Sequence, residues 1–252
     1  MNASIIPLCN GGLAQCRKRC RKIKAIPHAV ECYLGGAGMG AYYYTGVMYL
    51  LKCLEERRNI RIASFHGSSS GAVAAVAYLF DIDPDVWTRA YRHIQRAFGQ
   101  GCYLSHAYVG LLKQYEPRDA LERIRGRLHI YATELSFGFP QRCFTTFMSI
   151  DDLYQKVVAS TSIPFVTIPS LSTTIGGMAF VDGMSIAEST NTPTKGRIRL
   201  CMEPPSSYKW FYRFVPHDPC IHHLIQRGWD DAYFIFRTHK LVKNTRLTLP
   251  LS

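Results

Sequence analysis

The sequence predicts an α/β fold with a mainly parallel central sheet flanked by helices. Two units of strand, glycine-rich turn and helix follow one another directly between residues 29 and 79, and such units in series are typical of a parallel sheet. The chain has 252 residues, of which 47% are hydrophobic and 19% are charged. This composition is sufficient for the core of one large domain and excludes a disordered polar chain.

The elements are predicted in order from apolar spacing and turn residues. The first unit combines a strand over 29–34, a turn over 35–40 and a helix over 42–56. The second combines a strand over 60–66, a turn over 67–71 and an apolar helix over 72–79. After these come a helix over 84–98, a segment over 99–114 that fits a loop or a lid, a helix over 118–124, strands over 127–133 and 142–147, a helix over 150–160, a strand over 178–182 and a helix over 219–236.

We divide the chain into a basic, flexible N-terminal arm over 1–28, a folded domain over 29–240 and a short C-terminal tail over 241–252. Six basic residues lie within eight positions of the arm, which leaves open a solvated tail, a membrane-surface patch or a nuclear-import signal. The net charge of +12 attracts phosphates of nucleic acids or of lipid headgroups, and charge alone does not distinguish them. The basic residues of the arm are Arg17, Lys18, Arg19, Arg21, Lys22 and Lys24.

The cysteines and the apolar segments predict an intracellular, cytoplasmic protein. Nine cysteines, an odd number with no CxxC pair, favour reduced thiols in a reducing compartment. We see no secretory signal pattern, and the longest apolar stretch, 72–80, is about half of the roughly 20 residues that a membrane-spanning helix needs. We therefore expect any membrane contact to be peripheral. No metal-ligand spacing stands out, and we expect neither a metal nor another cofactor.

The second turn fits the pattern G-x-S-x-G, with Ser69 between Gly67 and Gly71. A serine on a sharp turn from strand to helix needs small residues two positions on either side, because the backbone packs too closely there for a Cβ atom. The helix N-terminus behind the serine favours a developing negative charge. Ser69 is therefore a candidate nucleophile.

The first turn allows two interpretations. Residues 36–41 fit the G-x-G-x-x-G/A fingerprint of dinucleotide-binding proteins, but that fingerprint requires an acidic residue near the end of the second strand. Phe65 and His66 stand there instead. The same loop fits an oxyanion hole, because consecutive glycines before a helix let backbone N–H groups converge on one oxygen beside the nucleophile.

A nucleophilic serine needs a base, and the sequence offers two kinds. Asp182 ends an apolar strand and is followed by Gly183, although an acid at a strand end is also a common turn former. Alternatively, a histidine completes a triad in the order Ser, Asp, His, which is the order of α/β-hydrolases. The histidines available for that triad are His217, His222 and His223.

Taken together, these motifs resemble the patatin-like phospholipase and acylhydrolase family. Residues 34–47 are similar to the family's glycine-rich loop and following helix, 67–71 match its serine turn, and Asp182 with Gly183 match its Asp-Gly motif. Segments 126–130, 159–165 and 228–232 are similar to the animal branch that includes adipose triglyceride lipase and adiponutrin. The resemblance runs from about residue 29 to 236 and implies a patatin-like three-layer fold for the domain over 29–240.

The resemblance also implies the roles of individual residues. Ser69 would be the nucleophile and Asp182 the base of a Ser–Asp dyad without histidine. Backbone N–H groups would form the oxyanion hole, and small residues would be needed at the motif glycines. The oxyanion residues are Gly36, Ala37 and Gly38, and the motif glycines are Gly67, Gly71 and Gly183.

Four positions depart from the family's pattern. Ala37 and Ala41 stand where glycines are usual, Gly40 where many members have a basic residue, and Met184 where a small residue is usual. An oxyanion hole uses backbone N–H groups, so alanine at 37 is compatible with it if φ stays negative. We expect Met184 to narrow the site. These departures raise a second hypothesis, a catalytically weak relative that binds lipid.

The activity that the resemblance implies is that of a phospholipase A type acyl hydrolase working through an acyl-enzyme. A carboxylate near its reference pKa of about 4 is a weak base at neutral pH, so we expect apolar surroundings for Asp182 from Phe180, Val181 and Met184. Alternatives are a triacylglycerol lipase of the same fold, the lipid-binding relative and a Ser-His-Asp α/β-hydrolase.

The expected partners are a membrane phospholipid or a neutral lipid as substrate, and an anionic membrane surface bound by the arm. Peripheral attachment to membranes or lipid droplets follows from this. No nucleic-acid module accompanies the charge, so we expect no nucleic-acid partner. Five residues of the segment over 99–114 fit an acyl entrance or, equally, a core helix: Tyr103, Leu104, Tyr108, Leu111 and Leu112.

Overall fold

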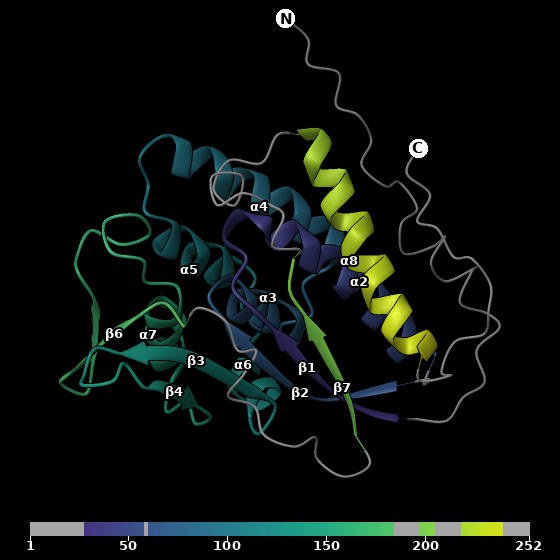
Figure 1. The fold of residues 1–252 in the computed structure, drawn as a ribbon, viewed down its shortest axis with the longest axis horizontal. Coiled ribbons are helices and arrows are strands. Elements are labelled where there is room, and N and C mark those ends of the chain that lie inside the picture. Colours follow the sequence, from purple (N-terminus) through teal and green to yellow (C-terminus); the bar gives the residue numbers. More distant parts are fainter. Residues whose placement is uncertain (1–27, 58–59, 184–196, 205–217, 239–252) are drawn as a thin grey trace, which may run out of the picture.

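In the computed structural model, which describes residues 28–57, 60–183, 197–204 and 218–238, parallel strands form the centre of a mixed sheet (Figure 1). The sheet has seven strands in the order β5-β6-β3-β2-β1-β7, and β4 also pairs with β3. The four strands from β3 to β7 in this order run parallel, whereas β4, β5 and β6 are antiparallel to their partners. The strands are β1 His28–Leu34, β2 Ile60–Ser68, β3 Leu128–Glu134, β4 Gln141–Phe144, β5 Thr173–Ile175, β6 Met178–Val181 and β7 Ile198–Met202.

Helices cover the sheet, and one of them is completely buried. Every residue of α3 is buried, as its run of small and apolar side chains requires. Helices α2 and α8 pack at short distance through Gly46 and Gly228; a Cβ atom at Gly46 would lie 1.9 Å from the Ile225 carbonyl oxygen. The helices are α2 Tyr42–Glu56, α3 Ser70–Leu79, α4 Pro84–Gly99, α5 Leu104–Gln114, α6 Ala120–Ile124, α7 Ile150–Ser160 and α8 Asp218–Thr238, with a short 3-10 helix, η2, at Gly38–Ala41.

The register of β3 places two strands end to end along one of its edges. Strand β2 pairs with β3 only as far as Ser68 opposite Tyr131. Strand β6 takes over farther along, with Val181 opposite Thr133, while β4 occupies the other edge. The C-terminal end of β6 therefore meets the C-terminal end of β2.

Most predicted elements are confirmed, and α2 and α7 have the predicted bounds. The segment over 99–114 is not a loop or lid along its whole length, because it contains α5, which buries Tyr108 and Leu112 in the core. The strand predicted over 142–147 ends at Phe144, and β5 and β7 were not predicted. The predicted arm over 1–28 and tail over 241–252 lie outside the described residues, apart from His28 at the start of β1.

None of the helices in the four described ranges combines the length and the apolar character needed to cross a membrane.

Candidate active site

Ser69 occupies a strained turn between β2 and α3. Its backbone angles are φ 54° and ψ −132°, a conformation that costs a non-glycine residue about 1–3 kcal/mol and is found mostly at functional sites. A Cβ atom at Gly67 would lie 2.4 Å from the Ala72 Cα atom, and one at Gly71 would lie 2.0 Å from the Leu34 carbonyl oxygen. Both motif glycines are thus required by close backbone packing.

The glycine-rich loop lies directly against this turn. The Ala37 N–H donates a 2.9 Å hydrogen bond to Ser70 Oγ, which joins the loop to the residue after Ser69. The φ angle of Ala37 is −134°, so alanine adopts this conformation without strain. Gly38 has φ 53° and needs the freedom of glycine.

The Ala37 N–H, one of the predicted oxyanion donors, already has a partner in this structure. It donates to Ser70 Oγ, and Ala37 is buried, whereas Gly36 and Gly38 are partly exposed. The oxyanion role of Gly36, Ala37 and Gly38 stays a prediction.

Tyrosine hydroxyls hold the carbonyl side of the loop. Tyr44, on α2, donates to the Gly35 carbonyl oxygen at 2.5 Å. Tyr91, on α4, donates to the Gly38 carbonyl oxygen at 2.9 Å and lies 2.5 Å from the Tyr108 hydroxyl of α5. Three helices therefore fix the orientation of the loop's peptide groups.

The end-to-end arrangement of β2 and β6 brings Asp182 and Gly183 to the serine turn. A Cβ atom at Gly183 would lie 2.1 Å from the Tyr131 carbonyl oxygen and 2.6 Å from Ser68 Oγ. The residue after Asp182 is therefore in contact with the residue before Ser69. This explains why glycine stands at position 183.

Ser160, the last residue of α7, connects the two segments. Its Oγ accepts a 2.9 Å hydrogen bond from the Ser69 N–H and donates to the Tyr131 carbonyl oxygen at 2.6 Å. Its own carbonyl oxygen accepts the Gly183 N–H at 3.1 Å. One buried serine thus holds the backbones of the Ser69 turn, β3 and the Asp-Gly motif.

Asp182 is fixed through its own backbone as well. Its N–H donates to the Ser162 carbonyl oxygen at 2.8 Å, and its carbonyl oxygen accepts from Thr133 Oγ1 at 2.9 Å. The carboxylate atom Oδ2 is buried. Burial, together with the charge of Asp182, raises the pKa of Tyr108, so the carboxylate lies near the tyrosine pair that holds the glycine loop.

The surroundings of Asp182 agree in part with expectation. Phe180 is fully buried and packs with Ala132 and Ala159. Val181 is partly exposed, and Met184 lies outside the described residues.

The structure describes two of the three histidines considered for a triad. His222 and His223 lie on α8, and His217 lies outside the described residues. The backbone groups of Ser69 and Asp182 are held by serine and threonine residues, as described above. His66 and His129 stack on each other in the sheet, with ring centroids 4.1 Å apart.

The residues considered for an acyl entrance form part of the core. Tyr103 at the start of α5 is 38% exposed, but the other four are buried. The core-helix interpretation is the one that the structure supports. The four buried residues are Leu104, Tyr108, Leu111 and Leu112.

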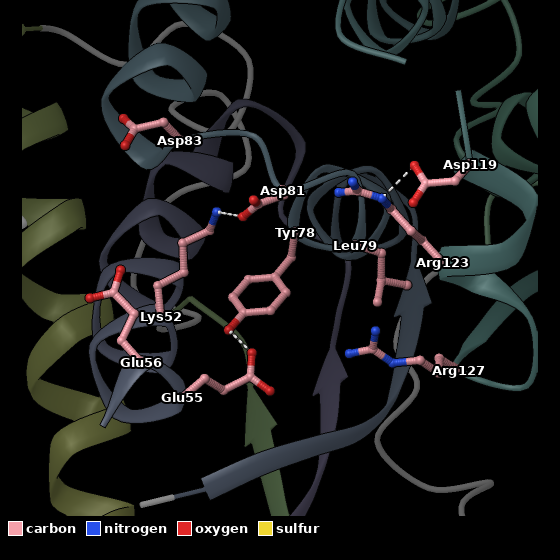
Figure 2. A pocket seen from close by; sticks show the side chains of 10 residues that line it. All are labelled: Lys52, Glu55, Glu56, Tyr78, Leu79, Asp81, Asp83, Asp119, Arg123 and Arg127. Atoms are coloured by element: carbon pink, nitrogen blue, oxygen red, sulfur yellow. Dashed lines mark hydrogen bonds and ion pairs between the residues drawn. The ribbon is translucent and has the colours of Figure 1, made fainter. Parts of the chain in front are cut away.

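A separate pocket of about 650 Å³, whose lining side chains are drawn in Figure 2, lies at the other end of α3 from Ser69. Tyr78 and Leu79, which line it, end this ten-residue helix, so the pocket begins about 15 Å from the serine turn. Its polar side chains largely bind one another: Lys52 with Asp81 at 2.5 Å, Tyr78 with Glu55 at 2.7 Å, and Arg123 with Asp119 at 2.8 Å. This pocket is therefore not part of the candidate active site.

Sequence reasoning did not identify Ser160 or Tyr91 as site residues, and it considered Tyr108 only for an acyl entrance or a core helix. Ser160 lies in a segment that carries the family resemblance, but its role depends on three backbone groups distant in sequence. The tyrosines have the spacing of ordinary core residues on α4 and α5, and no local signal distinguishes them.

Comparisons with known proteins agree with these motifs. A family model described as patatin-like phospholipase matches residues 33–193. A human protein, omega-hydroxyceramide transacylase, is 25% identical over 165 residues, which cover 62% of this chain and 30% of that protein. Mouse patatin-like phospholipase domain-containing protein 2 is 28% identical over 261 residues, which cover 85% of this chain and 52% of that protein.

The chain thus spans about half the length of the mouse protein and less than a third of the length of the human protein. Among solved structures, a chain of the heterodimeric ExoU–SpcU complex from the type III secretion system of Pseudomonas aeruginosa is 16% identical, with a TM-score of 0.49. That match covers 85% of this chain and 52% of the other.

Proposed function

The chain belongs to the patatin-like phospholipase family, a family of lipid esterases, and from this premise we propose that it hydrolyses fatty-acyl esters of glycerophospholipids with Ser69 and Asp182. The observation that carries the proposal is the meeting of β2 and β6, which puts Gly183 against Ser68 and so brings Asp182 to a strained serine turn. The Asp182 carboxylate atom Oδ2 is buried, and burial of a carboxyl group in general favours its protonated form.

The reaction begins when Asp182 accepts the proton of Ser69 and Oγ attacks the ester carbonyl carbon. The tetrahedral oxyanion is stabilised by the N–H groups of Gly36 and Gly38, and collapse releases the alcohol, which takes the proton back from Asp182. Water then attacks the acyl-enzyme while Asp182 accepts one of its protons, and collapse releases the fatty acid as Asp182 returns that proton to Ser69 Oγ. Loss of one oxyanion donor typically lowers the rate about a hundredfold.

Two other functions are possible for the same residues. A triacylglycerol lipase takes the acyl group from a different lipid, and a transacylase passes it to an alcohol instead of water. A triacylglycerol lipase would use the same residues on a neutral lipid. A human relative is named as a transacylase, and an acyl-enzyme that excludes water would pass its acyl group to an alcohol in the same manner. Both are distinguished by analysing all acylated products from mixed phospholipid and triacylglycerol substrates.

The central test compares wild type with Ser69→Ala and Asp182→Asn for fatty-acid release from phospholipid vesicles. We expect both variants to lose at least about a thousandfold in rate, because each removes an essential part of the nucleophilic step. Equal background release by all three proteins would contradict the hydrolase, and vesicle binding without release would favour the lipid-binding relative.

The triad alternative is tested in the same assay. We expect His222→Asn and His223→Asn to retain wild-type activity. Activity that survives Asp182→Asn and disappears with either histidine variant would favour the Ser-His-Asp mechanism.

A further inference from the structure

Exposed hydrophobic side chains gather around the strand that delivers Asp182. Among the described residues, those near β6 with at least 40% of the side chain exposed form a set that we call the apolar rim. Phe137 is fully exposed, and Phe139, Phe165 and Leu171 are each about two-thirds exposed. The rim consists of Leu135, Phe137, Phe139, Phe165, Leu171 and Met178.

A hydrogen bond, strand pairing and sequence position place the rim residues near β6. The Leu135 N–H donates to the Ala179 carbonyl oxygen at 2.8 Å, so the connection from β3 to β4 lies beside the first residues of β6. Phe165 lies three residues after Ser162, whose carbonyl oxygen holds Asp182. Leu171 lies just before β5, which pairs with β6.

The segments that carry the rim contain no charged side chains. Residues 163–179, of which only Thr167 and Ile168 are buried, contain no Asp, Glu, Lys, Arg or His, and neither do residues 135–141. A water-facing surface with this composition is unusual, because surface loops are normally rich in charged groups. A charge-free surface is what insertion below lipid headgroups requires, since burial of a charge there is costly.

Two phenylalanines of the rim are held in strained backbone conformations. Phe139 has φ 47° and Phe165 has φ 58°, a region in which bulky residues are true outliers. Burial in the core cannot explain this strain, because both side chains are two-thirds exposed. Strain of this kind is typical of sites with a function.

We propose that the apolar rim docks on a phospholipid bilayer, with its side chains below the headgroups. Docking would hold the C-terminal end of β2, which Ser69 follows, towards the membrane. The inference rests on the proposed function, because the rim surrounds the strand that carries Asp182. Docking by apolar side chains does not need anionic lipid, in contrast to attraction of a basic arm.

The test replaces the strained phenylalanines in the full chain by Phe139→Asn and Phe165→Asn, together. Asparagine tolerates the left-handed conformation, so the double variant should fold and melt at the same or a higher temperature. We expect its binding to neutral phosphatidylcholine vesicles in high salt, measured by flotation, to weaken about tenfold or more. The matched control is Phe234→Asn on α8, on the other side of the molecule from β6 (Figure 1).

The control is suitable because Phe234 is 62% exposed, like the two rim residues. Equal loss of binding by the control, or unchanged binding by the rim variant, would overturn the proposal. A rim variant that binds vesicles normally but loses self-association in sedimentation would indicate a second copy of the chain as the occupant instead.

A soluble short-chain ester separates this inference from the proposed function. The rim variant should hydrolyse that ester at the wild-type rate while its release of fatty acid from vesicles falls with its binding. If wild type hydrolyses neither substrate, the proposed function fails, and flotation still tests the rim.

Discussion

At the scale of single residues, Ser160 connects three backbone segments of the candidate site. It binds the backbone of Ser69, Tyr131 and Gly183, and it is fully buried. Since a strained turn such as that of Ser69 persists only where its surroundings over-determine it, we regard Ser160 as a positioning residue. It has no exposed surface with which to touch substrate.

We predict that Ser160→Ala lowers kcat about tenfold or more and leaves KM nearly unchanged, because the nucleophile moves while the lipid surface is unaffected. The free energy of unfolding should fall by about 2 kcal/mol, since a buried N–H and a buried carbonyl lose their partner. Steady-state kinetics and urea unfolding measure both effects.

Ser105→Ala is the control for this prediction. Ser105 is equally buried and donates to the Thr161 carbonyl oxygen at 3.0 Å, but it has no contact with the backbone of Ser69. It should lose comparable stability and keep kcat. A parallel loss of kcat in both variants would mean that Ser160 acts only through stability.

At the scale of elements, the apolar spacing of a segment predicts its secondary structure wherever that segment buries one apolar face of its own. The bounds of α2 and α7 follow from the spacing of their apolar residues, because packing against neighbouring elements favours the same helical structure. The failures have tertiary causes. Segment 99–114 was ambiguous alone and becomes α5 through burial in the core, and β5, with only three residues, depends on pairing with β6.

The central strands also carry a stack of side chains across one face of the sheet. Tyr33, His66 and His129, from β1, β2 and β3, stack with ring centroids 4.2 and 4.1 Å apart, and the Arg199 guanidinium lies 4.2 Å from the centre of the Tyr33 ring. Burial, with the positive charge of His129 and Arg199, lowers the pKa of His66 to about 3. Burial lowers the pKa of His129 too.

The stack predicts acid sensitivity of the folded state. Between pH 6.5 and about 3 the unfolded chain binds a proton at His66 that the folded chain does not. The contribution of neutral His66 to the free energy of unfolding is therefore fully present above pH 6.5, and it is lost as the pH drops through this window. We predict that His66→Phe, which keeps an aromatic ring in the stack, shows a shallower fall of melting temperature between pH 7 and 4.5.

The control for the stack is His106→Phe, because His106 on α5 is exposed. Its melting temperature should follow that of the wild type across the same pH range. If His66→Phe also follows the wild type, the acid sensitivity arises elsewhere.

At the scale of the whole molecule, the feature that bears on membrane binding is the net charge of +12. Much of it lies in residues 17–24, outside the described residues. We propose that this segment attracts anionic lipid, which would supply long-range attraction while the apolar rim supplies short-range docking.

We therefore predict that vesicles containing phosphatidylserine bind the protein more tightly than neutral vesicles at low salt, and that high salt removes the difference. Replacing the six basic residues of 17–24 by Gln should remove the salt dependence, while the residual binding in high salt stays the same. Equal binding to neutral and anionic vesicles at low salt would contradict a role for the arm.

The α/β class, the order of most elements, the family and the candidate pair Ser69 and Asp182 are all predictable from the amino-acid sequence. The reason is that periodic apolar spacing and glycine-rich turns are local properties of the chain. How these residues meet depends on the folded chain. The shared edge of β3 joins β2 to β6, Ser160 and the tyrosines fix the peptide groups around the serine, and the Ala37 N–H is directed to Ser70. Each of these depends on hydrogen bonds between segments far apart in the chain, for which no local pattern exists.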